Sequence, residues 1–186
     1  MEALKTHIRN TISIQEDELA EITDAFQSQT VSRDSFVLKA GQFCDAYYFV
    51  ETGAFRIFTN LDEKDITSWF AFEGYFFTEP ESYAKLCRSR FNIQAIEESV
   101  IYLISRKKMD ELLSKSLNWN EFIRKSWEQA FIKLQDVVLS FQAQSAGERY
   151  ENLFNYPDFL QKARQQDLAS MLGVTRFSLS RLRGKK

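Results

Sequence analysis

The chain has 186 residues, 44% of them hydrophobic and 27% charged, which is an ordinary globular composition and excludes disordered and collagen-like classes. Its net charge of −2 argues mildly, as a whole-chain average, against nucleic acid as a partner. A single histidine, His7, excludes a multi-histidine metal centre, and Cys44 and Cys87 form no C-x-x-C pair. We therefore expect no metal, haem or iron–sulfur cofactor.

The first 30 residues have a helical pattern. Ser13 and Glu16 have the spacing of a capping box, and Leu19, Ile22 and Phe26 then share one helix face. The N-terminus lacks the apolar core of a signal peptide, and no run approaches the ~18 apolar residues of a membrane span. We expect a cytoplasmic protein without a membrane partner.

Residues 34–105 change to short aromatic or β-branched runs separated by turn-like stretches, which indicates strands. The runs are 36–39, 47–51, 54–60, 66–72, 91–96 and 100–105. Near-alternation of apolar residues in two of them is typical of half-buried strands. Regular spacing of short strands favours a jelly-roll barrel, and with the helices on either side the fold class is α+β.

Two helices are expected next, at 107–116 and at 118–146, the second without a glycine or proline. A heptad seam runs along the second helix at alternating spacings of 4 and 3: Ile123, Trp127, Ala130, Leu134, Val137, Phe141 and Gln144. Phe122, Phe131 and Val138 add a second apolar stripe. This pattern predicts a dimerisation helix that contacts the barrel on one flank and a second copy on the other. The alternative is a long helix that packs only on its own barrel.

The charge is partitioned along the chain. Residues 147–186 carry eight basic and four acidic side chains, a net charge of +4, which leaves −6 for residues 1–146. Within this basic segment, Leu168, Ala169 and Leu172 share one face of a short helix that Gly173 can end. Thr175 is a good N-cap for a second helix. This spacing predicts a helix-turn-helix.

The second helix of such a motif enters the major groove of DNA. Its outward side carries Arg176, Phe177, Ser180 and Arg181. Arginine can bind guanine bidentately, and a phenylalanine can contact a thymine methyl group. The residues suited to phosphate contact are Thr175, Ser178, Arg183, Lys185 and Lys186. The alternative is a pair of amphipathic helices with a solvated basic face.

The order of strands, long helix and helix-turn-helix resembles the CRP/FNR transcription regulators. The resemblance implies a cyclic-nucleotide-binding-like sensor at 1–117, a dimerisation helix at 118–146 and a DNA-binding unit at 147–186. Arg176 and Arg181 match the two arginines of the family's recognition helix, whereas Phe177 replaces the family's glutamate, so we expect a different target preference. The family's C-terminal wing is expected to be missing.

The same resemblance implies an effector site. Thr78 and Glu79 resemble part of the family's Phe-Gly-Glu segment, and Arg88, Ser89 and Arg90 loosely resemble its phosphate-binding motif. Two arginines beside a glutamate can hold an anion. Bulky Phe91 at the family's alanine position argues against cyclic AMP, and the alternative is a degenerate pocket with surface charges.

We therefore expect a homodimeric regulator that is not an enzyme, with double-stranded DNA carrying an inverted repeat as its partner and RNA polymerase as a possible further one. One alternative is a protein-interaction module with a degenerate sensor and no specific DNA target. Another is a cupin-type enzyme, but such enzymes commonly need several metal-binding histidines, and only His7 is present.

Overall fold

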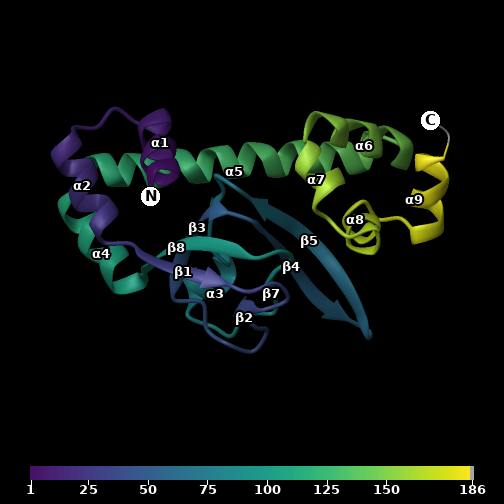
Figure 1. Ribbon diagram of the computed structural model, residues 1–186, viewed down its shortest axis with the longest axis horizontal. Helices are drawn as coiled ribbons and strands as arrows, with labels where there is room; N and C mark the ends of the chain where they lie inside the picture. Colours follow the sequence, from purple (N-terminus) through teal and green to yellow (C-terminus); the bar gives the residue numbers. More distant parts are fainter. Residues whose placement is uncertain (185–186) are drawn as a thin grey trace.

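The computed structural model describes residues 1–184, in which a two-sheet roll lies beneath one long helix and beside a group of C-terminal helices (Figure 1). The helices are α1 (Glu2–Thr11), α2 (Glu16–Asp24), α3 (Pro80–Lys85), α4 (Arg106–Lys115), α5 (Leu117–Ala143), α6 (Ala146–Asn152), the 3-10 helix η1 (Leu153–Asn155), α7 (Pro157–Gln161), α8 (Gln165–Met171) and α9 (Arg176–Arg183). The strands are β1 (Gln27–Val31), β2 (Phe36–Leu38), β3 (Ala46–Thr52), β4 (Ala54–Leu61), β5 (Lys64–Phe72), β6 (Phe76–Phe77), β7 (Asn92–Ala95) and β8 (Ser99–Ser105).

The strands form two antiparallel sheets rather than a closed barrel. Their orders are β1-β8-β3-β6 and β2-β7-β4-β5. All six strands expected from the sequence are confirmed, but β1 and β6 were not predicted. β1 lies where a helix was expected, because four of its five residues are exposed and polar and it becomes a strand only by pairing with β8.

The N-terminal segment is two helices, and the expected capping box is wrong. Gln15 is the N-cap of α2 and makes no side-chain capping bond. Glu16 instead accepts two hydrogen bonds from the Arg9 guanidinium, at 3.0 and 2.7 Å. Phe26 lies beyond the end of α2, where its ring packs edge-on against Trp119 with centroids 6.0 Å apart.

Strand β3 shows why the roll is so aromatic. Tyr47 and Phe49 face the cluster formed with α1, α4 and α5, while Tyr48 and Val50 face the core between the two sheets. Successive side chains of a strand point to opposite faces, so both faces of β3 are buried. The alternation expected of a half-buried strand is therefore absent from its sequence.

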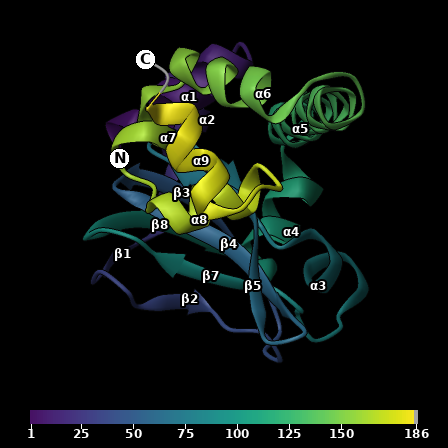
Figure 2. The same cartoon turned by 90° about the vertical axis from the view of Figure 1, so that its right-hand side faces the viewer.

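The second sheet is covered on its outer face by the C-terminal helices. Phe70 and Phe72 of β5 form one buried cluster with Phe159, Leu168 and further residues of α6–α9. Figure 2, turned so that α5 is seen end-on, shows α8 against β4 and β5 with α9 farther out. The C-terminal helices thus share a hydrophobic core with the roll.

Gly53 connects β3 to β4 with φ +97°, a conformation that favours glycine. A Cβ added there would lie 2.1 Å from the Ser99 hydroxyl oxygen and 2.7 Å from the Ser99 Cα. We predict that Gly53→Ala lowers the free energy of unfolding by at least ~1–3 kcal/mol, because it adds strain at a fixed turn. Urea unfolding measures this; Gly41→Ala, also at positive φ but with open space around it, should cost less.

Candidate nucleic-acid interface and effector pocket

Helices α8 and α9 form the expected helix-turn-helix. Gly173 adopts φ +70° after α8, and the Val174 amide donates to the Ala169 carbonyl at 3.0 Å. The Thr175 hydroxyl caps α9 by accepting a hydrogen bond from the Ser178 amide at 3.1 Å. Leu179 is fully buried against α8 and its neighbours, which fixes the face that α9 turns outward.

The outward face of α9 is free of contacts with the roll. Arg176, Phe177, Ser180 and Arg181 are all exposed, and Phe177 is 81% exposed. Of the residues predicted to contact phosphates, Thr175, Ser178 and Arg183 are exposed, whereas Lys185 and Lys186 lie outside the described residues.

The residues of the heptad seam on α5 do not all have the same surroundings. Ile123 and Ala130 line a cavity beside the roll, and Val137 lines a second one beside the C-terminal helices. Phe141 lies under the Arg149 guanidinium, 4.4 Å from its ring centroid. Trp127 and Leu134 are 44% and 57% exposed.

A continuous apolar surface on α5 is made from both predicted stripes. It consists of Trp127, Phe131, Leu134 and Val138, at spacings of 4, 3 and 4, and is called the exposed stripe below. Phe122, from the second stripe, is instead fully buried, with its ring stacked on Trp119 at 4.8 Å. The helix is therefore buried against the roll at its first turns, whereas its middle faces the roll on one side and solvent on the side of the exposed stripe.

Two cavities lie along the roll-facing side of α5. The first, of about 410 Å³, lies between α5 and the roll, and the second, of about 600 Å³, lies between β5, α5 and the C-terminal helices. Trp69, Tyr75 and Lys133 line both. Both volumes are in the range of small-molecule sites. The first is lined mainly by aromatic rings, including Tyr47, Phe76 and Trp127.

The five residues predicted to bind an effector are only partly brought together. Thr78, Glu79 and Arg90 line the first cavity, whereas Arg88 and Ser89 do not. Arg88 donates to the Gly41 carbonyl at 2.7 Å, and the Ser89 hydroxyl exchanges hydrogen bonds with the Phe91 backbone at 3.0 Å.

The three that line the cavity also have internal partners. Glu79 is 3% exposed and caps α3: its carboxylate accepts the amides of Glu81 at 3.2 Å and Ser82 at 3.0 Å. Thr78 donates to the Ala46 carbonyl at 2.8 Å. Arg90 pairs with Glu81 at 3.2 Å. Both side chains are exposed, so Arg90 can leave this pair and bind a ligand instead.

His7 lines the first cavity and lies beside the rings of Phe49 and Phe122, with centroids 5.5 and 5.7 Å away. Burial lowers the pKa of its imidazole below the ordinary value of 6.5, and the positive charge of Lys133 lowers it further. The folded state therefore favours neutral His7. This contribution to stability is present above pH 6.5 and is lost as the pH falls through the lowered pKa.

We predict that the imidazole titrates with a midpoint below 6.5, which NMR can follow without ambiguity because the chain has one histidine. Lys133→Gln should raise the midpoint without restoring 6.5, since burial is the larger cause. A midpoint at or above 6.5 in the unmodified protein would contradict the placement of His7.

Sequence reasoning missed a polar contact between the C-terminal helices and the roll. Arg56 of β4 and Asp167 of α8 are 6% and 3% exposed, with their charged groups 3.2 Å apart. Burial raises the pKa of Asp167, and the neighbouring guanidinium groups of Arg56 and Arg164 oppose this. The one available signal was an arginine inside the apolar run of β4.

Residues 28–116 match the family of cyclic nucleotide-binding domains. The whole-chain arrangement is similar to that of solved regulators. Residues 28–116 are thus similar to a cyclic nucleotide-binding domain, and the chain has the fold of the CRP/FNR transcription regulators. These regulators are not enzymes, so the cupin-type alternative has no support from family or fold. No curated protein sequence matches the chain.

Three solved structures illustrate the similarity. FixK2 from Bradyrhizobium japonicum is 19% identical with a TM-score of 0.71, over 86% of this chain and 83% of that one. A putative CRP/FNR-family regulator from Eubacterium rectale is 15% identical with a TM-score of 0.69, over 95% and 87%. A putative cAMP-binding regulatory protein from Silicibacter pomeroyi is 18% identical with a TM-score of 0.68, over 100% and 88%. At these identities the likeness establishes the fold.

Among residues 1–184 no helix is both long and apolar enough to cross a membrane. The same residues contain no group of three or more histidine, cysteine, aspartate or glutamate side chains placed to hold a metal ion.

Proposed function

We propose that this protein is a transcription regulator that binds double-stranded DNA as a homodimer and inserts α9 of each subunit into the major groove of an inverted repeat. The observation that carries the proposal is the exposed face of α9, which displays Arg176, Phe177 and Arg181 on a helix anchored by buried Leu179. Arginine and phenylalanine supply guanine and thymine contacts.

In this proposal residues 1–117 are the sensor, residues 118–146 the dimerisation helix and residues 147–186 the DNA reader. The exposed stripe of α5 supports a second copy as the partner of that helix, because contiguous exposed apolar residues on a helix are typical of a protein–protein interface. RNA polymerase is a further partner consistent with a regulator.

We propose the first cavity as the effector site, with Arg90 as the cation available to a small anionic ligand. Its aromatic lining favours a ligand with apolar surface. Cyclic AMP is disfavoured because Glu79, which the family resemblance places in the effector site, has a carboxylate that already caps α3.

A salt titration tests DNA binding and separates it from the protein-interaction alternative. Affinity for duplex DNA should fall steeply between low and physiological salt, with a log–log slope of about −0.9 for each phosphate neutralised. Absent or salt-insensitive retention on DNA and heparin would favour an interaction module that carries its basic C-terminus incidentally.

A further inference from the structure

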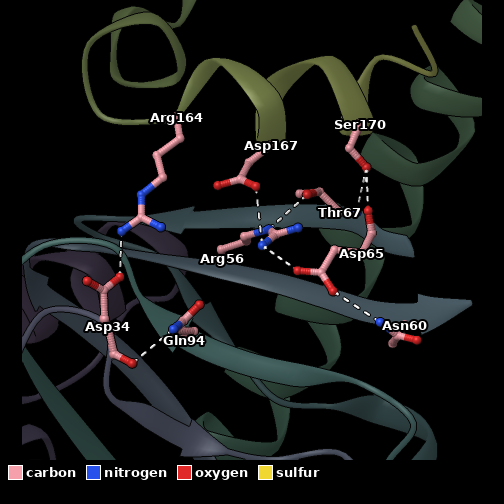
Figure 3. A network of polar contacts seen from close by, with 9 residues as sticks. All are labelled: Asp34, Arg56, Asn60, Asp65, Thr67, Gln94, Arg164, Asp167 and Ser170. Atoms are coloured by element: carbon pink, nitrogen blue, oxygen red, sulfur yellow. Dashed lines mark hydrogen bonds and ion pairs between the residues drawn. The ribbon is translucent and has the colours of Figure 1, made fainter. Parts of the chain in front are cut away.

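Helix α8 docks on the β4–β5 face of the roll through a buried polar network (Figure 3). The Arg56 side chain lies at its centre. Its Nε donates to the Thr67 hydroxyl at 2.9 Å, and its terminal nitrogen lies 3.2 Å from both Asp65 and Asp167. The guanidinium also lies over the Phe58 ring, 4.1 Å from its centroid. One residue of the roll thus ties its own sheet to α8.

Ser170 makes a second connection, one turn farther along α8. The Thr67 amide donates to the Ser170 hydroxyl at 2.9 Å, and that hydroxyl donates to the Asp65 carbonyl at 3.2 Å. β5 is an edge strand, so these outward-facing backbone groups have no partner within the sheet. The Ser170 hydroxyl therefore provides a hydrogen-bond partner for one backbone amide and one backbone carbonyl of the edge strand β5.

Two ion pairs at the margin of the contact differ from the centre. Arg164 pairs with Asp34 at 2.6 Å and Lys162 with Glu97 at 3.0 Å, and all four side chains are at least one-quarter exposed. Solvent and salt weaken such pairs. Arg56 and Asp167 are almost fully buried, and a buried charge left without its partner is strongly unfavourable.

The docked position of α8 leaves the DNA-facing side of α9 exposed, so the contact does not cover it. α9 follows α8 after a short turn and packs on it through Leu179. Any rotation of α8 relative to the roll therefore moves α9 as well. A dimer must hold its two recognition helices about one DNA turn apart, which requires a fixed orientation of each.

We propose that Arg56, Asp65, Asp167 and Ser170 form a positioning latch that holds the helix-turn-helix on the roll of its own subunit in the orientation that reads DNA. The latch rests on the proposed DNA-binding function and adds a route by which the sensor controls it. A ligand or partner that shifts the β4–β5 hairpin would act directly on α8. Phosphate contacts carry no sequence information, so affinity for random duplex should depend less on the latch than affinity for the inverted repeat does.

The Thr67 amide provides a readout that needs no DNA. Arg56→Met leaves the buried Asp167 carboxylate without its ion pair to Arg56. We expect α8 to detach and the Thr67 amide to exchange with solvent at least ~10-fold faster in NMR hydrogen exchange. The Ile101 amide, in the central strand β8 of the other sheet, should not change and reports that the roll remains folded. Lys162→Ala, which removes only ion pairs at the margin of the contact, with Glu97 and Asp158, is the matched control.

The double variant Arg56→Met/Asp167→Leu shows whether the effect of Arg56→Met comes from the unpaired charge of Asp167 rather than from loss of the arginine side chain itself. Apolar replacement of both partners removes the unpaired charge, so docking and slow Thr67 exchange should return. Affinity for the inverted repeat should fall ~10-fold in Arg56→Met and recover in the double variant, with affinity for random duplex changed less than ~3-fold.

Unchanged Thr67 exchange in Arg56→Met would overturn the latch. Faster exchange with unchanged or increased affinity for the inverted repeat would overturn its positioning role. If the unmodified protein binds no DNA, the proposed function fails, while the exchange measurements still decide whether Arg56 holds α8 on the roll.

Discussion

Replacing Arg176 and Arg181 together by alanine should abolish specific DNA binding. Both side chains are exposed on the outward face of α9, so their loss leaves the core around Leu179 intact. A bidentate arginine–guanine contact contributes about 1–3 kcal/mol of discrimination, and losing two should weaken binding to the inverted repeat by at least ~30-fold. Electrophoretic mobility shift or fluorescence anisotropy measures this.

The matched control removes two arginines elsewhere. Arg33→Ala/Arg124→Ala changes the net charge by the same amount at side chains that are 62% and 58% exposed and lie away from α9. This variant should bind the inverted repeat with nearly unchanged affinity. Equal affinities of the two double variants would show that α9 does not read the DNA.

Phe131→Glu/Val138→Glu should convert the proposed homodimer to a monomer. Both residues belong to the exposed stripe, 60% and 45% exposed in the single chain, and a glutamate there would place an unpaired charge in an apolar interface. Glutamate is a good helix former, so α5 itself should remain helical. We expect the dissociation constant of the dimer to rise at least ~100-fold, since losses of ~3 kcal/mol are typical of hot-spot residues at the centre of an interface.

Ile132→Glu/Leu139→Glu is the control, because it makes the same change at the same spacing on a different face of α5. These residues are 56% and 59% exposed, but they lie outside the exposed stripe. Sedimentation velocity should find this variant dimeric and the Phe131/Val138 variant monomeric. A dimer that survives in both would exclude the exposed stripe as the interface.

The local elements were readable from the sequence because each has a local cause. Gly173 and Thr175 end one helix and begin the next through backbone conformation and capping, both of which depend on neighbouring residues. Aromatic and β-branched runs identify strands whether one face or both are buried. β1 was not predicted because its polar residues form a strand only by pairing with β8, which lies about 70 residues away in the sequence.

The functional assignments were harder where one residue can serve two roles. Glu79 was assigned to an effector by resemblance, yet it precedes Pro80, and a proline at the first helical position is a local sign of a helix start. The contact between Arg56 and Asp167 joins residues 111 positions apart, and no periodicity reveals it. The division of the α5 seam between roll, cavities and solvent likewise depends on how the helix is rotated.

The whole-chain charge of −2 gave little support to a DNA-binding protein, whereas its partition places net positive charge on the segment that carries α9. Selection of bound duplexes from a random-sequence pool by the purified protein tests this most directly. We predict enrichment of an inverted repeat whose half-sites lie about 34–36 Å apart, centre to centre. Recovery of no common sequence, under salt conditions in which the protein retains DNA, would contradict sequence-specific recognition by α9.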